Sequence, residues 1–179
     1  MTFRIATRLA EDTVSKLQNE AESDLLLDGR AMVQIGQYFV GGSAKGEEAW
    51  LEGMELDEFL MTFVQAARKL RRDRVKVSMN FSGLVLQLEA SRSGDLVLLS
   101  QRVIAPSGQV IPALVSIEQE AVPYIEFCHE IQAATTRFLR EVGSLNPAAL
   151  ESFMVTSLSG EAKHLVSEER SKRPRNTKS

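Results

Sequence analysis

Residues 39–53, FVGGSAKGEEAWLEG, contain the glycines and the lysine that phosphate-binding loops use. In a loop of the G-x-x-x-x-G-K-[ST] type, the lysine follows the last glycine and the loop joins a strand to a helix. Here Lys45 precedes Gly46, and Glu47 and Glu48 follow, where their carboxylates would repel a phosphate. The pattern therefore predicts a flexible hairpin connection instead of a phosphate site.

Cysteine and histidine offer nucleophilic or metal chemistry at very few positions. The chain has one cysteine, Cys128, and two histidines, His129 and His164. Neighbouring residues of a helix point about 100° apart, so Cys128 and His129 do not face each other. Cys128 falls on an apolar helical stripe that predicts a core position. One histidine does not supply the converging ligands of a metal site, so we expect no catalytic residue, no metal and no cofactor.

Six carboxylates crowd into twelve residues around the only tryptophan, Trp50: Glu47, Glu48, Glu52, Glu55, Asp57 and Glu58. If a strand begins at Trp50, then Glu48, Trp50, Glu52 and Met54 share one face. Two interpretations stay open. Either Trp50 is buried against the sheet and the acids are merely solvated, or an acidic edge with a large aromatic side chain docks a basic protein. The candidate partner-binding residues are Glu47, Glu48, Trp50, Glu52 and Glu55.

Paired carboxylates can also carry acid–base chemistry, and Glu52 with Glu55 is one such pair. On a regular strand these two residues point to opposite faces, which argues against a shared catalytic site. The sequence therefore favours a non-catalytic protein, with an enzyme that uses surface carboxylates as an alternative.

Two segments are strongly basic. Residues 68–76 hold six lysines and arginines, four of which suit the end of a helix because cations there complement the helix dipole. Residues 170–179 hold five basic side chains and no acid. Such a tail can contact nucleic acid in a salt-dependent way, yet it has no aromatic residue for base stacking. A solubilising, disordered tail is the favoured interpretation.

Composition limits the class of protein. The 179 residues are 44% hydrophobic and 25% charged, which indicates one soluble globular domain. Residues 1–159 carry a net charge of −6 and residues 160–179 a net charge of +3, so an acidic body that attracts basic partners precedes a basic tail. A single cysteine fits a reducing compartment, and no apolar run is long enough to span a membrane. The expected location is the cytoplasm.

Hydrophobic periodicity predicts the elements that position these residues. Residues 31–40 alternate as a strand after a turn at Asp28 and Gly29, and the segment from Trp50 pairs back on that strand. Residues 57–72 form an amphipathic helix with acids at its start and bases at its end.

Four further strands are predicted over residues 75–81, 84–90, 95–104 and 111–117, joined as an antiparallel meander. A helix over residues 123–142 stops at Gly143, and a shorter helix over residues 147–158 ends near Ser159 and Gly160. The predicted fold is α+β, in the order ββ-α-ββββ-αα, with a mainly antiparallel sheet of about six strands and helices packed on one face. Residues 1–159 make a single domain, of which 1–29 are uncertain, and residues 160–179 a basic, disordered C-terminal tail.

The run DGRAMVQIGQYFVGG, followed by AWLEGMELDEFLMTFVQAARKL, resembles in its layout the immunity-type proteins of bacterial polymorphic toxin systems. These open with a strand pair that carries a tryptophan, followed by a helix, a strand meander and an amphipathic helix comparable to residues 124–141. The likeness covers residues 25–139. It implies a non-catalytic inhibitor that blocks a toxin, often a basic nuclease, with the acidic edge around Trp50 as one candidate surface. An acidic chaperone for a secreted substrate, which binds through an exposed apolar groove, is an alternative.

Overall fold

The structure, a computed structural model, describes residues 2–20, 25–81, 86–104 and 114–172. Its class is α+β, as the sequence predicts, but the described strands form two antiparallel sheets instead of one. The first sheet consists of β1 (Phe3–Leu9), β2 (Asp28–Ile35), β3 (Tyr38–Phe39) and β4 (Leu51–Glu55). The second consists of β5 (Lys76–Asn80), β6 (Leu86–Ser93), β7 (Leu96–Val103) and β8 (Glu120–Pro123).

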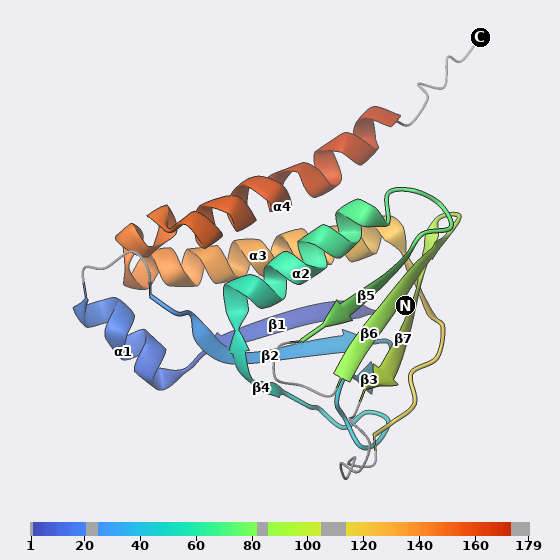
Figure 1. The fold of residues 1–179 in the computed structure, drawn as a ribbon, viewed down its shortest axis with the longest axis horizontal. Helices are drawn as coiled ribbons and strands as arrows, with labels where there is room; N and C mark the ends of the chain where they lie inside the picture. The colour runs from blue at the N-terminus through green and yellow to red at the C-terminus, as the bar shows by residue number, and fades with distance from the viewer. Residues whose placement is uncertain (1, 21–24, 82–85, 105–113, 173–179) are drawn as a thin grey trace.

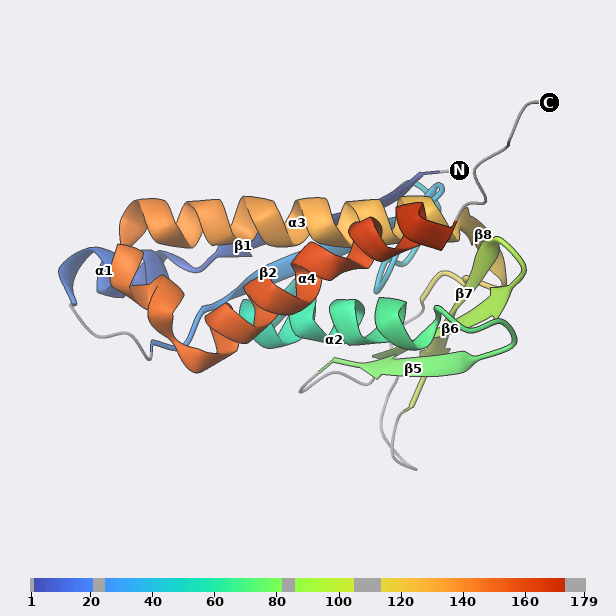
Figure 2. The same cartoon turned by 90° about the horizontal axis from the view of Figure 1, so that it is seen from above.

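The described part of the chain holds four α-helices and one short 3₁₀ helix. They are α1 (Glu11–Asn19), α2 (Leu56–Lys69), α3 (Tyr124–Leu145), the short 3₁₀ helix η1 (Pro147–Glu151) and α4 (Phe153–Lys172). Helices α2, α3 and α4 lie above the sheets (Figure 1). Seen from above, α4 crosses over α2 and α3 and forms the outermost layer (Figure 2).

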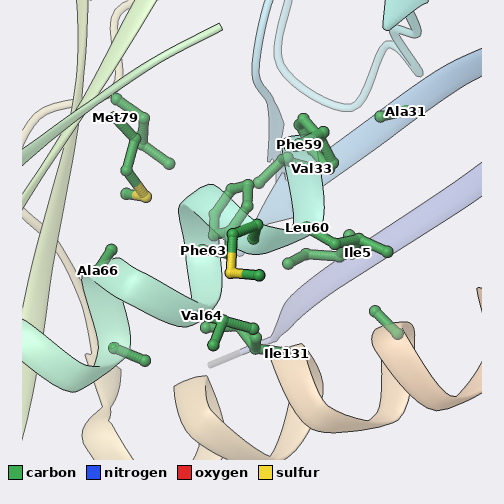
Figure 3. Packing of buried hydrophobic residues seen from close by; sticks show 14 of the residues in the cluster. Ile5, Ala31, Val33, Phe59, Leu60, Phe63, Val64, Ala66, Met79 and Ile131 are labelled. Atoms are coloured by element: carbon green, nitrogen blue, oxygen red, sulfur yellow. The ribbon is translucent and has the colours of Figure 1, made fainter. Parts of the chain in front are cut away.

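Helix α2 is central to the core because its apolar stripe meets both sheets. Phe59, Leu60, Phe63 and Val64 project from it among buried residues of β1, β2, β5 and α3 (Figure 3). The Phe63 ring packs 5.2 Å from the Phe59 ring and 5.9 Å from the Phe81 ring, measured between centroids. The observed helix, Leu56–Lys69, confirms the helix that the 3.6-residue period predicts over residues 57–72.

The first sheet departs from the prediction at both ends of β2. Asp28 and Gly29 begin this strand and do not form a turn. Gly29 is needed for close packing, since a Cβ atom there would lie 2.2 Å from the carbonyl oxygen of Arg8. The strand predicted over residues 31–40 is broken after Ile35, where Gly36 turns with a φ of 61° and lets β3 fold back.

The second sheet has its fourth strand later in the sequence than predicted. Residues 105–113, which include most of the predicted strand over 111–117, lie outside the described residues, and residues 114–117 are not in a strand. The fourth strand is β8, which pairs with β7 in the register Leu96↔Pro123. Pro123 therefore ends a strand at the sheet edge, where its missing N–H costs no ladder bond, and α3 begins at Tyr124.

Both C-terminal helices are longer than predicted. Helix α3 runs through Gly143, where a Cβ atom would lie 2.8 Å from Cδ1 of Leu150, so this glycine permits close packing and does not stop the helix. Helix α4 continues past Ser159 and Gly160 because Ala162 and Leu165 are buried against the layer below. The predicted boundary between a folded domain and a tail at residue 160 thus falls inside a helix.

Side chains of α3 close the outer edge of β1. Glu130 accepts a hydrogen bond from the backbone N–H of Ile5 at 3.0 Å, and Arg137 donates to the carbonyl oxygen of Ile5 at 2.8 Å. Arg137 also pairs with Glu130 at 2.7 Å. Ile5 lies opposite Val33 of β2, but its N–H and C=O point away from β2, so Glu130 and Arg137 satisfy backbone groups on an edge that would otherwise be open.

Candidate functional site: an acidic pocket at the start of helix α2

Trp50 lies just before β4 and is half-buried. The guanidinium groups of Arg8 and Arg30 lie 5.4 Å and 4.9 Å from its ring centroid, and its indole Nε1 donates a hydrogen bond of 2.7 Å to Glu48. Arg8 and Arg30 are opposite each other on β1 and β2. Cation–π contacts therefore hold Trp50 against the outer face of the first sheet, and it belongs to neither a fully buried core nor a bare surface.

Three of the predicted acids already have partners within the protein. Ser43 donates a hydrogen bond to Glu47, Glu48 accepts from Trp50, and Glu52 lies 3.8 Å from the guanidinium of Arg30. Of these three acids, Glu52 faces an arginine, whereas Glu47 and Glu48 accept hydrogen bonds from neutral donors.

The strand faces differ from the prediction because β4 contains a bulge. Arg30 pairs with Glu52 and Asp28 with Glu55, so Gly53 is an extra residue, with a φ of 65° that favours glycine. Glu52 and Glu55 therefore lie on the same face of β4, contrary to the prediction. Met54 lies on the core side, 3% exposed, and does not share a face with Glu52. A glycine within a strand pattern is the signal that could have indicated this bulge.

Glu55 belongs to a second group of acids around a pocket of about 270 Å³. The pocket lies between the end of β4, the first turns of α2 and the end of β5. We call it the acidic pocket; it is lined by Met54, Glu55, Glu58, Phe59, Thr62, Asn80 and Phe81.

The acidic pocket combines an apolar floor with a charged rim. Met54, Phe59 and Phe81 are at most 4% exposed and form the floor, whereas the carboxylates of Glu55 and Glu58 are exposed. Neither Glu55 nor Glu58 forms an ion pair with a lysine or arginine in the described part of the chain. Aromatic faces and free carboxylates both attract an organic cation, and an apolar floor suits an aliphatic stem.

The carboxylates around the acidic pocket repel one another. Removal of water by neighbouring atoms raises the pKa of Glu55, and the nearby charges of Glu58, Asp28 and Asp57 raise it further. Burial likewise raises the pKa of Asp57 above its ordinary value, although a hydrogen bond from the Glu58 amide opposes the shift. A cationic group bound here would relieve this repulsion.

Comparison with protein-family models, with curated proteins and with solved structures found no match to this chain.

Sequence reasoning found Glu55 and missed most of the acidic pocket. Asp28, Asn80 and Phe81 come from β2 and from the end of β5, and only the folded chain brings them to the start of α2. Phe59 lies on the apolar face of the helix predicted over residues 57–72 and is buried, and it also lines the pocket.

The glycine-rich loop before Trp50 uses its amides within the fold. The N–H of Gly41 donates to the Gln101 side chain at 2.8 Å, and the N–H groups of Gly42 and Gly46 donate to the carbonyls of Phe39 and Gln37. These are the groups that a phosphate-binding loop would offer to its ligand. Among the described residues no group of three or more histidine, cysteine or acidic side chains is placed to hold a metal ion, and no helix has the length and apolar character needed to cross a bilayer.

Proposed function

We propose that this protein is a non-catalytic binding protein whose acidic pocket receives a lysine or arginine side chain of a basic protein partner. The observation that carries the proposal is the pairing of an aromatic and methionine floor with unpaired carboxylates at the rim. The floor accommodates the methylene stem of a basic side chain, and Glu55 and Glu58 face its charged head.

The electrostatics favour a cationic partner over a neutral one. Desolvation first, and then the nearby carboxylates, raise the pKa values of Glu55 and Asp57, so their ionised forms carry a free-energy cost in the isolated protein. A bound cation lowers those pKa values again, so binding at mildly acidic pH releases protons into the buffer. Proton release distinguishes this mode from docking on the ion-paired surface around Trp50.

The test is calorimetric binding of lysine- and arginine-containing peptides in buffers that differ in ionisation enthalpy. We expect binding of basic peptides with proton release, and loss of both in Glu55→Gln combined with Glu58→Gln. The matched control is Glu48→Gln combined with Glu52→Gln, which removes the same charge from the predicted edge and is expected to retain binding. A loss confined to the Glu48 and Glu52 variant would move the site to the Trp50 edge. Equal losses in both variants would show that binding follows total charge and not the acidic pocket, and no effect of either would reject charge-led docking.

A toxin-neutralising immunity protein is the finer form of this proposal. Its support is the layout resemblance of residues 25–139 together with an acidic pocket suited to a basic protein. A toxin partner would insert one basic side chain into the pocket, and the Glu55→Gln and Glu58→Gln variant would then lose protection against that toxin while it keeps its fold.

A chaperone-like binder is a second candidate because one apolar surface is open. Phe153 is 84% exposed at the start of α4, and Leu150 and Met154 beside it are also exposed. Salt titration separates the two candidates, since binding to the acidic pocket weakens as salt rises and binding to the apolar surface does not. Replacing Phe153 by Ser should affect only the second.

A further inference from the structure

The opposite end of helix α2 carries a basic groove that the proposed function does not use. Its cavity volume is about 760 Å³, and we call it the basic groove. It is lined by Arg68, Lys69, Arg71, Arg72, Val75, Lys76, Val77 and Ser78. The helix end and the edge strand β5 supply its two walls, so five cationic side chains from one short segment face a common channel.

The helix dipole and local ion pairs account for only part of this charge. Cations in the last turn of α2 complement its dipole, Arg68 pairs with Glu161, and Lys76 lies 3.0 Å from Glu89. Lys69 and Arg72 are exposed, and neither makes an ion pair with an acid in the described ranges of the chain. Unbalanced cations in a concave channel attract an anion.

The segment between α2 and β5 is held in place before any ligand arrives. The carboxylate of Asp73 accepts a hydrogen bond of 3.0 Å from the amide of Gly94, and the backbone of Arg92 bonds to those of Arg74 and Val75. The turn from α2 to β5 is thus tied to the turn between β6 and β7. A preformed groove loses little entropy when it binds.

Helix α4 runs toward the same end of the molecule as the last turn of α2, and a basic sequence occupies its C-terminal end and the residues that follow. Its middle contacts the end of α2, where Arg71 donates to the carbonyl oxygen of His164 at 3.2 Å. Its C-terminal end then continues beyond the end of α2, as both views show (Figures 1 and 2). The helix carries Arg170 and Lys172, and the following sequence adds Arg173, Arg175 and Lys178.

We propose that the basic groove binds the phosphate backbone of a nucleic acid. Planar guanidinium groups recognise phosphate oxygens in pairs. No aromatic residue lines the groove, so it reads no bases and binds without sequence preference. Protein interfaces usually centre on an aromatic or large apolar residue, and no such residue lines the groove. A flat membrane would need a convex or planar face, whereas the groove is concave.

The test uses the full-length protein and a short, dye-labelled oligothymidylate, with affinity measured against salt. We expect the logarithm of the association constant to fall with the logarithm of salt with a slope of about −2 to −3.5, the values for three to five phosphate contacts on a single strand. Lys69→Gln combined with Arg72→Gln should reduce the steepness by about 1.4. Both residues are exposed, so an unchanged thermal melt will show that the variant is folded.

The matched control is Arg4→Gln combined with Lys16→Gln, which makes the same change in net charge at exposed positions on β1 and α1. It should bind as the wild type does. The proposal is overturned if the control weakens binding as much as the groove variant does, or if oligonucleotides fail to bind while poly-glutamate or anionic vesicles bind. It is also overturned if replacing Arg173, Arg175 and Lys178 by glutamine abolishes binding while the groove variant leaves it intact. None of these results depends on the acidic pocket.

Discussion

Asp57 shows how one carboxylate can report on the acidic pocket. Its pKa is raised, so the folded state holds a proton at pH values where the unfolded chain, with an ordinary value of 3.8, has released it. Folding therefore takes up a proton within this window, and stability falls as pH rises through it. Above the raised pKa the repulsion is present in full.

We predict that Asp57→Asn raises the free energy of unfolding at neutral pH by about 0.5 kcal/mol. It removes the cost of a partly desolvated charge near other carboxylates, which exceeds the lost attraction to the helix dipole, and it keeps the side-chain acceptor for the Glu58 amide. The gain should vanish below pH 3.8. Urea unfolding across this pH range measures it. Asp12→Asn, at the first turn of α1, is the control and should lose stability through the helix dipole. A pH-independent effect at Asp57 would contradict the argument.

Arg74 occupies a left-handed backbone conformation, with a φ of 60°, in the turn that precedes β5. A side chain in this conformation costs roughly 1–2 kcal/mol that glycine does not incur. We predict that Arg74→Gly raises stability by about 1 kcal/mol. Arg74→Ala keeps a side chain in the strained conformation, so chemical denaturation should show no increase in its free energy of unfolding. An equal increase in both variants would show that removal of the charge causes the effect.

At the scale of single elements, Gly143 separates two interpretations of α3. If Gly143 ended the helix, replacing it by alanine would destabilise the protein. In the structure Gly143 lies within the helix, next to the flexible end of the partly exposed Leu150 side chain. We predict that Gly143→Ala stabilises the protein by about 0.5 kcal/mol, since the gain in helix propensity exceeds the cost of rotating Leu150. Thermal unfolding measures the sign, and a clear loss of stability would mean that Leu150 cannot move.

Elements with strong local signals could be predicted from the sequence. Helix α2 has eight buried apolar residues and opposite charges at its two ends, and all of these features are local in sequence. Strands β5 to β7 alternate regularly and were found within a few residues of their observed bounds. The sequence did not indicate that the strands divide into two sheets, because this depends on which strands pair across long separations in the chain.

The errors have physical reasons at particular residues. Ser159 and Gly160 are poor helix formers, yet burial of Ala162 and Leu165 carries α4 through them. Gly53 adds one residue to β4 and reverses the faces of everything after it. The acidic pocket needs Asn80 and Phe81 as well as Glu55, and no spacing rule connects those positions.

At the scale of the whole molecule, the two proposed sites lie at opposite ends of one helix of 14 residues, about 21 Å long. The acids at its start and the cations at its end each lie where the helix dipole favours them. A basic protein and a nucleic acid are thus attracted to different ends, and each is repelled by the other end.

The contact between α3 and β1 gives a prediction for the molecule as a whole. Glu130→Ala combined with Arg137→Ala leaves the backbone groups of Ile5 without their partners. We expect a loss of roughly 1–3 kcal/mol and increased aggregation through the open strand edge. Light scattering during storage measures aggregation. Glu126→Ala combined with Arg140→Ala, exposed on the same helix, should behave as the wild type does.

The same contact has a consequence for refolding. The residues that protect β1 come from a helix 125 positions further along the chain. The strand pair β1–β2 can therefore form before α3 packs against the edge of β1. Local hairpins and helices form within microseconds, whereas contacts of such long separation come later. During that interval two partly folded chains can join through their exposed strands. The yield of refolded monomer should therefore fall as the protein concentration rises, even though the completed fold stays monodisperse.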